Sequence, residues 1–239
     1  MTGADALEQR RGSLPSPYEF KGSPYSSHSR LLEAFPARGD GRAVIDVGDG
    51  EGLLSRPLLE RGYRVICVAL PGSVSPHTPP DVAVIEADLN RELPELESGC
   101  SHALCGDVLE HLVDPGETLR WLAATLAPDG RLVASLPNSA HWFVRLNVLM
   151  GRFPEDDKGL FDRTHLHFYA WRNWKSLLER SGFVVESVTP TVIPFDLALP
   201  RLGRGLIVRM LEAVNFALAK AGRDLWAYQL VVVARKAGH

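Results

Sequence analysis

The chain has 239 residues, of which 45% are hydrophobic and 23% charged, and its formal net charge is −3. This length suits one α/β domain with additions, and the charge gives no support for nucleic-acid binding. No run approaches the roughly 18 apolar residues of a membrane-spanning helix, and the polar start of the chain lacks the apolar core of a signal peptide. We therefore expect a cytoplasmic protein with no nucleic-acid partner and no membrane span.

Two segments precede the first predicted strand. Residues 1–25 are rich in Pro, Ser, Gly and charge, so we expect a flexible N-terminal arm. Residues 26–35 have the pattern of a short helix, with Ser26 or Ser27 as its N-cap. Residues 26–239 show no repeat and no second boundary, which favours a single domain.

The segment 43–52, AVIDVGDGEG, carries the clearest local signal. Its apolar residues surround Asp46 and predict a buried strand, and the leucines that follow the segment have helical spacing. Between strand and helix lie three alternating glycines: Gly48, Gly50 and Gly52. Glycine tolerates positive φ and lets a ligand approach the backbone, so this turn is a candidate binding loop. A sharp strand-to-helix turn without a ligand would need the same residues.

The rest of the chain alternates between apolar runs and helical patterns. Further strands are predicted at 64–70, 82–87, 102–106, 131–136, 183–188 and 228–235. Further helices are predicted at 115–126, 172–181 and 206–221, the last with its apolar face on the sheet. Four prolines argue against a helix in 71–80, and 127–130 has turn residues. Such alternation implies parallel pairing, with ligands bound beyond the carboxyl ends of the strands.

Residues 137–168 interrupt this alternation with histidines, arginines and aromatic residues. We expect an insertion that forms a substrate lid over the strand ends, with a helix at about 142–150. His165 and His167 share one face of an extended segment, but no third ligand is evident. A hydrogen-bonded lid is therefore favoured over a metal site, and no metal is expected.

The glycine segment resembles the first motif of class I S-adenosylmethionine (SAM) methyltransferases, an acid and an apolar residue before G-x-G-x-G. Asp49 departs from that motif, which often has a small residue or cysteine there. Later segments resemble, in the same order, the small-molecule branch related to ubiquinone-biosynthesis O-methyltransferases: GDVLEHLVDP at 106–115, SLPN at 135–138, DRTHLHF at 162–168 and LLERSGF at 177–183. The resemblance implies a Rossmann-like, doubly wound α/β fold. Its seven-stranded sheet would be mostly parallel, with helices on both faces and an antiparallel last strand.

The resemblance also implies SAM as cofactor and S-adenosylhomocysteine (SAH) as product. The matching cofactor-binding positions are Asp46, Gly48, Asp49, Gly50, Gly52, Ala69, Leu70, Asp88, Leu89, Asp107 and Val108. The glycines would line the methionine part, and Asp46 would orient its amino group. Asp88 with Leu89 would face the adenine, and Asp107 with Val108 the sulfonium region.

One of these positions lacks the expected chemistry. The second strand of the family normally ends in an acid that accepts hydrogen bonds from the ribose hydroxyls. Ala69 or Leu70 occupies this place and cannot accept such a bond. Losing it would cost on the order of 1.5–3 kcal/mol of binding free energy. Asp49 and Glu51 are candidates for compensation.

Methyl transfer is an in-line displacement, and an oxygen acceptor must also lose its proton. His111 is the first candidate base, because the resemblance places Glu110 and His111 at the mouth of the site; a structural role has equal weight. His141 is the second candidate. We predict SAM-dependent methyl transfer to a small-molecule acceptor, with oxygen favoured. The alternatives are a fold repurposed for cyclisation or rearrangement, and a non-catalytic partner protein. The acceptor and the oligomeric state stay open, a homodimer being possible.

Overall fold

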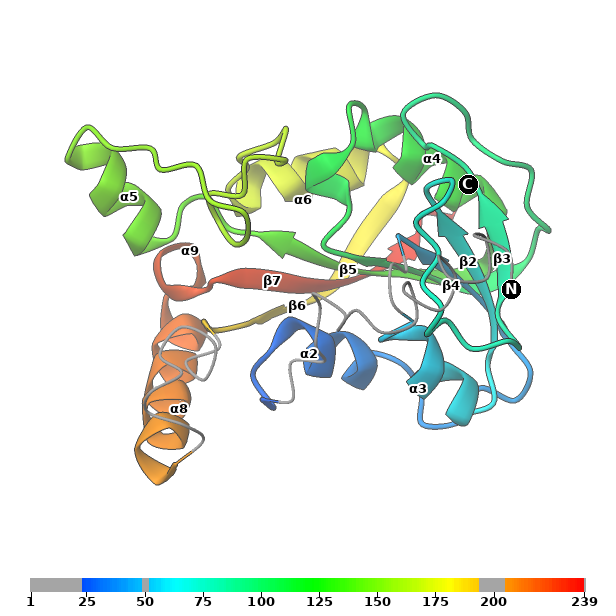
Figure 1. Cartoon of the computed structure of the whole chain (residues 1–239), viewed down its shortest axis with the longest axis horizontal. Coiled ribbons are helices and arrows are strands. Elements are labelled where there is room, and N and C mark those ends of the chain that lie inside the picture. Colours follow the sequence, from blue (N-terminus) through cyan, green and yellow to red (C-terminus); the bar gives the residue numbers. More distant parts are fainter. Residues whose placement is uncertain (1–22, 49–51, 194–204, 239) are drawn as a thin grey trace, which may run out of the picture.

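The computed structural model describes residues 23–48, 52–193 and 205–238. Its centre is a seven-stranded sheet with the strand order β3-β2-β1-β4-β5-β7-β6 (Figure 1). The strands are β1 (Ala43–Val47), β2 (Arg64–Ala69), β3 (Ala83–Glu86), β4 (Cys100–Gly106), β5 (Leu126–Pro137), β6 (Phe183–Pro190) and β7 (Gln229–Lys236). The first five strands pair in parallel, whereas β7 is antiparallel to both β5 and β6. The predicted mostly parallel sheet with an antiparallel last strand is confirmed.

Helices cover both faces of this sheet. They are α2 (Ser27–Glu33), α3 (Ser55–Glu60), the short 3-10 helix η1 (Leu109–His111), α4 (Pro115–Thr125), α5 (Trp142–Leu149), α6 (Trp171–Arg180), α8 (Leu206–Ala221) and α9 (Arg223–Trp226). Figure 1 shows α4 and α6 on one face and α2 and α3 on the other. Because side chains alternate along a strand, β1 sends Ile45 into the core beneath α4 and Val44 into the core beneath α2.

Local sequence signals account for several element boundaries. Ser26 is the N-cap of α2, because its hydroxyl accepts the Ser29 amide hydrogen at 3.3 Å. Residues 71–80 contain no helix, as the prolines predict. The helix predicted at about 142–150 is α5. Residues 1–22 of the predicted arm, and Asp49 to Glu51 of the glycine turn, lie outside the described residues.

Residues 127–130 fold back tightly, as the predicted turn requires, but they lie within β5 instead of before it. Cys100 of β4 pairs with Leu126, and His102 pairs with Arg131, so four residues of β5 but only one residue of β4 lie between the two pairs, and β5 bulges there. A Cβ on Gly130 would lie 2.9 Å from the Ala127 carbonyl oxygen, which shows how tightly the bulge folds back. Residues 127–130 therefore form a tight fold-back that does not end the strand.

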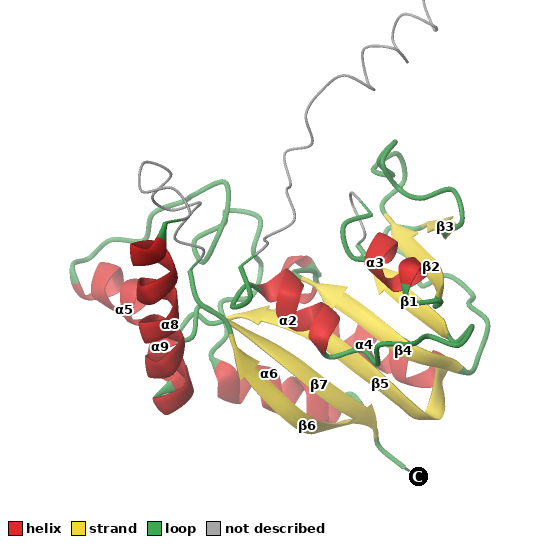
Figure 2. Cartoon of the chain, turned by 90° about the horizontal axis from the view of Figure 1, so that it is seen from below, coloured by secondary structure: helices red, strands yellow, loops and turns green. Residues whose placement is uncertain are grey.

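Helix α8 does not bury its apolar face on the sheet, so that expectation is wrong. Figure 2 shows α8 standing beside the end of the sheet. It contacts the first described residues, because Glu212 accepts a hydrogen bond from the Ser23 hydroxyl at 2.9 Å and the Phe216 ring lies 4.7 Å from the Tyr25 ring. Leu206, Ile207, Met210, Leu211, Val214 and Leu218 are exposed. Across the described part of the chain, no helix has the length and apolarity to cross a membrane.

His102 lies in the core between β4 and α2. Its side chain is 4% exposed, and its ring centroid is 4.9 Å from that of Phe35. Burial lowers the pKa of His102 to about 4. The folded chain therefore keeps this imidazole neutral at pH values where the unfolded chain protonates it.

We predict that His102 makes the folded state acid-sensitive. Between pH 6.5 and pH 4 the unfolded state binds the extra proton, so the free energy of unfolding falls with falling pH by up to about 1.4 kcal/mol per pH unit from this residue. Urea unfolding of wild type and His102→Gln at pH 7, 6 and 5 measures this difference. His77→Gln, at an exposed position, is the control. Parallel pH dependences for wild type and His102→Gln would contradict the prediction.

Candidate active site

The carboxyl ends of β1, β2 and β4 meet at one edge of the sheet. Val47 at the end of β1 pairs with Val68 of β2 and with Cys105 of β4. The next residue, Gly48, donates its amide hydrogen to the Val68 carbonyl at 2.8 Å and has a φ of +78°. A Cβ on Gly48 would lie 2.6 Å from Cγ2 of Val108, so this position admits no side chain. The structure thus brings Gly48 and Val108 into direct contact.

Asp46 and Gly52 frame the glycine turn. Asp46 is buried, and its Oδ2 accepts a hydrogen bond from the Ser55 hydroxyl at 2.8 Å, which ties β1 to the start of α3. Gly52 has a φ of +66°, and a Cβ there would lie 2.9 Å from Cδ of Pro79. The proline-rich loop therefore lies against Gly52, and Arg56 donates to the His77 carbonyl at 3.0 Å. Asp49 and Gly50 are not among the described residues.

Asp88 and Leu89 follow β3 at the same edge. Asp88 is half-buried; its Oδ1 accepts the Asn90 amide hydrogen at 3.1 Å and its Oδ2 lies 3.2 Å from Nε of Arg91. Leu89 packs against the main core. Contacts of the Asp88 carboxylate within its own loop fix its position. The adenine-binding role of both residues stays a prediction.

The end of β2 lacks an acid, but a neighbouring strand supplies one. Ala69 is buried and Leu70 is 55% exposed, and neither side chain can accept a hydrogen bond. Ala69 pairs with Glu86 in the parallel register, which puts the two side chains on the same face of the sheet. Oε1 of Glu86 accepts the Gly72 amide hydrogen at 2.9 Å, so this carboxylate reaches the loop after β2. The sequence alone does not identify Glu86, because only the pairing of β2 with β3 shows that it lies beside Ala69.

Asp107 adopts an unusual backbone conformation just beyond β4. Its φ is +55°, in the left-handed region that non-glycine residues rarely occupy. Its amide hydrogen is donated to Oγ of Ser135 at 2.9 Å, and its Oδ1 accepts hydrogen bonds from the Ser135 hydroxyl and, at 3.0 Å, from Nε2 of Gln229. Side chains from β5 and β7 thus hold this carboxylate at the edge. Strained residues of this kind cluster at functional sites.

Residues 162–168, here named the strap, bind to η1. The Leu166 amide donates to the Glu110 carbonyl at 2.8 Å, and the His167 ring donates through Nε2 to the Leu112 carbonyl at 2.8 Å. These bonds agree with the interpretation of the segment as a hydrogen-bonded lid. The two histidines of the strap have different partners, because His165 lies beside Glu110 instead.

His111 is oriented by the strap. Its Nδ1 lies 3.0 Å from the Thr164 hydroxyl oxygen and 3.2 Å from the Thr164 carbonyl oxygen. The Thr164 hydroxyl donates to Oδ1 of Asp162 at 2.6 Å, so it accepts a hydrogen bond from Nδ1 of His111. The network therefore assigns the proton of neutral His111 to Nδ1 and leaves the lone pair on Nε2.

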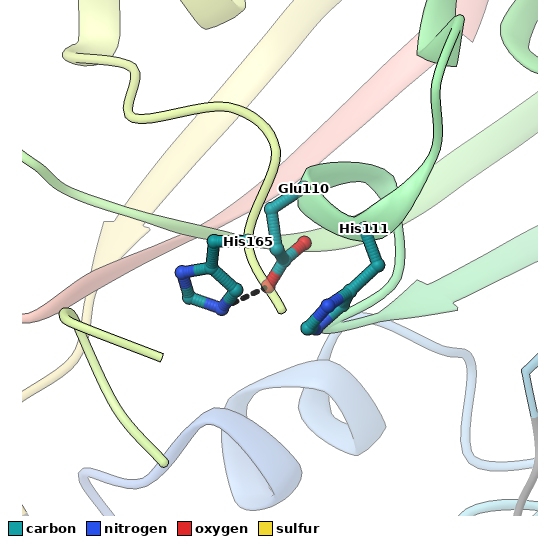
Figure 3. A group of neighbouring side chains, drawn as sticks. All are labelled: Glu110, His111 and His165. Atoms are coloured by element: carbon teal, nitrogen blue, oxygen red, sulfur yellow. Dashed lines mark ion pairs between the residues drawn. The ribbon is translucent and has the colours of Figure 1, made fainter. Parts of the chain in front are cut away.

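Glu110, His111 and His165 form a compact polar cluster (Figure 3). Nε2 of His165 is 3.9 Å from Oε1 of Glu110, and the centroids of the two imidazole rings are 4.8 Å apart. The side chains of Glu110 and His165 are only 1% and 7% exposed. Burial, with a smaller effect of His111, lowers the pKa of His165. The cluster thus joins η1, after β4, to the strap.

His141 occupies a different environment. It is fully buried, and its Nδ1 accepts the Phe143 amide hydrogen at 3.3 Å as the N-cap of α5. Burial lowers the pKa of His141 to about 4. The ring lies 6.0 Å from that of Tyr228, edge to face. These contacts supply a structural role, and the catalytic role of His141 stays a prediction.

Comparisons with known proteins agree with this arrangement. A family model described as "Methyltransferase domain" matches residues 23–188. The ubiquinone biosynthesis O-methyltransferase of Caulobacter sp. (strain K31) is 30% identical over 122 residues, which are 46% of this chain and 48% of that protein. The chain thus spans about half the length of the curated relatives it matches.

Two solved structures share the fold over nearly the whole chain. One is the putative methyltransferase in a complex with the Haloferax volcanii Trm112 methyltransferase activator, with a TM-score of 0.62, 17% identity and coverage of 99% of this chain and 97% of that one. The other is an S-adenosylmethionine-dependent methyltransferase from Mesorhizobium loti, with a TM-score of 0.58, 20% identity and coverage of 88% and 98%.

The close approach of Gly48 to Val108 gives a prediction about stability. Gly48→Ala must adopt a left-handed conformation, at about 1–2 kcal/mol, and must also displace Val108, at about 1–3 kcal/mol more. Gly41→Ala is the matched control, because Gly41 has a φ of +74° and no atom lies within 4 Å of the place that a Cβ would occupy. Denaturant unfolding should show the larger loss for Gly48→Ala. Equal losses would mean that the contact with Val108 is not a constraint.

Proposed function

The chain belongs to the methyltransferase domain family, within the class I SAM-dependent methyltransferases, and from this premise we propose that it methylates an oxygen atom of a small molecule. SAM is its cofactor and SAH the product. The preference for oxygen is supported by the relatives described as ubiquinone biosynthesis O-methyltransferases. Neither the repurposed fold nor the non-catalytic partner has support among these relatives. A cytoplasmic location is part of the proposal, in keeping with the ordinary composition and the net charge of −3.

The proposed cofactor site is the carboxyl edge of β1, β2 and β4. Gly48 exposes its backbone there and contacts Val108. The carboxylate of Asp107 next to Val108 is held in place by a hydrogen bond from Gln229. The methionine part of SAM would lie along this line, with the turn after β1 beneath it. Asp46, which accepts a hydrogen bond from Ser55 at the start of α3, would orient the amino group of the methionine part. Asp88 and Leu89 would contact the adenine.

Glu86 is proposed to replace the missing acid of β2. One of its oxygens already accepts from Gly72, which holds the carboxylate over the end of β2, and the other oxygen is left to accept from the ribose hydroxyls. The pairing of Glu86 with Ala69 supports this role, since Ala69 is one of the two residues, with Leu70, at the place where the acid is expected.

The orientation of His111 is the observation that supports an oxygen acceptor. With Nδ1 held by Thr164, Nε2 can accept the proton of an acceptor hydroxyl. The acceptor oxygen then forms a bond to the SAM methyl carbon while the carbon–sulfur bond breaks, and SAH leaves. The rings of Phe153 and Phe168 have centroids 5.1 Å apart and are both exposed, which gives this segment an apolar surface suited to a ring-containing acceptor.

The role of Glu86 predicts the effect of one isosteric change. Glu86→Gln keeps an oxygen for Gly72 but loses the charge, so SAH should bind about 10- to 100-fold more weakly. Isothermal titration calorimetry with SAH measures the affinity, and Glu92→Gln, at an exposed position in the loop after β3, is the control. Unchanged affinity in Glu86→Gln would exclude the ribose contact. Absence of SAH binding by the folded wild type would exclude the cofactor site.

The role of His111 predicts a selective loss of turnover. His111→Ala should lower kcat by about 10²- to 10⁴-fold, because a positioned proton acceptor is lost, while the Kd for SAH stays the same. Thr164→Val should lower kcat less, and Thr164→Ser should restore it, because serine keeps the hydroxyl that orients Nδ1. SAH formation with a panel of phenols and other hydroxyl compounds measures kcat. Full activity of His111→Ala would exclude this residue as the base.

A further inference from the structure

The amino end of β7 lies at the same edge of the sheet as the carboxyl ends of β4 and β5. Because β7 runs antiparallel to β5, its first residue, Gln229, pairs with Pro137 at the end of β5. Asp107 follows β4 directly, and the two side chains meet although they are 122 positions apart in the chain. We propose that Gln229 is a positioning residue of the cofactor site, which holds the Asp107 carboxylate so that the site distinguishes SAM from SAH.

The contact between Gln229 and Asp107 spans the strand that lies between them. Nε2 of Gln229 donates to Oδ1 of Asp107 at 3.0 Å, and the Ser135 hydroxyl of β5 donates to the same oxygen. Neighbouring strands lie about 4.8 Å apart, so a side chain on β7 must be long to pass β5 and reach the residue after β4. Glutamine has this length and carries a donor at its end, whereas asparagine is one methylene shorter.

The backbone of Gln229 is fixed by the residue that follows β6. Its amide hydrogen is donated to Oγ1 of Thr191 at 3.1 Å, and its carbonyl oxygen accepts the Thr191 amide hydrogen at 2.9 Å. Both residues are buried. A side chain whose backbone is already ordered loses less freedom when it binds a partner, so Gln229 can hold a carboxylate in one place.

The backbone of Asp107 needs such support. Its φ of +55° lies in the left-handed region, which a non-glycine residue keeps only where its surroundings hold it there. Its amide hydrogen is donated to Oγ of Ser135 at 2.9 Å, so Ser135 binds both the backbone and the carboxylate. Gln229 adds a donor from β7, and the carboxylate is therefore bound by side chains of two strands.

A negative charge held at this place affects which ligand binds. An aspartate carboxylate is ordinarily ionised near pH 7, and Asp107 is half-buried, so part of its surface is open to a ligand. SAM and SAH differ by one methyl group and by the positive charge of the SAM sulfonium. A carboxylate fixed near the sulfur therefore strengthens the binding of SAM more than that of SAH, and a carboxylate that is free to move away does so less.

This inference rests on the proposed function, in which the methionine part of SAM lies beside Gly48 and Asp107. During methyl transfer the methyl carbon leaves sulfur without the bonding electron pair, which stays on sulfur and cancels its positive charge. The attraction between Asp107 and the sulfur is then lost. The contact with Gln229 would thus favour exchange of the product SAH for a new molecule of SAM.

Isothermal titration calorimetry with SAM and with SAH tests this role and needs no methyl acceptor. Gln229→Met keeps the length of the side chain but loses the donor, and Gln229→Asn keeps the amide but is too short to reach Asp107. Each should weaken SAM binding about 3- to 10-fold, while the Kd for SAH stays the same. Arg235→Gln, at an exposed position of the same strand, is the matched control and should bind both ligands like wild type. Circular dichroism confirms that each variant is folded.

Asp107→Asn tests the charge itself. Asparagine has nearly the same size and tolerates the left-handed conformation, but it carries no charge. This variant should weaken SAM binding at least about 10-fold and leave SAH binding unchanged.

Three results would overturn the inference, and each has a different meaning. Equal losses for SAM and SAH in Gln229→Met would mean that Gln229 has only a structural role. Unchanged SAM binding in both Gln229 variants would exclude the positioning role, although the cofactor site would stand. Absence of SAM and SAH binding by the folded wild type would overturn the proposed cofactor site, and the role of Gln229 with it.

Discussion

The hydrogen bond from the Leu166 amide to the Glu110 carbonyl joins the two segments on which the candidate site depends. One segment, η1, follows β4 at the edge of the sheet, and the other is the strap, residues 162–168. Because the bond fixes them side by side, Thr164 can orient His111 and His165 can lie against Glu110. Both partners of this hydrogen bond are backbone groups, so it does not depend on the side chains of the candidate functional residues.

The parallel register of the sheet sets the other half of the site. It brings Gly48 and Asp107 to one edge from strands more than fifty residues apart, and it places Glu86 beside Ala69. A carboxylate from the next strand can therefore occupy the region that an acid on β2 normally serves. Side chains from several strands reach the same region at this edge, so a functional group that is absent from one strand can come from the neighbouring strand.

Features that depend on local periodicity were predictable from the sequence. The strands, the N-cap of α2 and the irregular loop at 71–80 follow from residue spacing and backbone preference. The turn chemistry of residues 127–130 was predictable too, but not that these residues lie within β5, because that depends on the pairing of β5 with β4 on both sides of them. The exposed face of α8 was also missed, since its amphipathic pattern does not show that the helix contacts Tyr25 and leaves most of its apolar side chains uncovered. The place of Glu86 beside β2 and the cluster around His165 arise from contacts between segments that are distant in the chain. Such contacts cannot be predicted from a single sequence.

The most direct test of the carboxyl edge as the SAM site is a crystal structure of the chain with bound SAH. We predict that the methionine part lies between Gly48 and Asp107 and that the ribose hydroxyls donate to the Glu86 carboxylate. SAH bound at another face of the sheet would contradict the site. SAH bound at this edge with its ribose hydroxyls away from Glu86 would contradict the substitution of Glu86 for the missing acid.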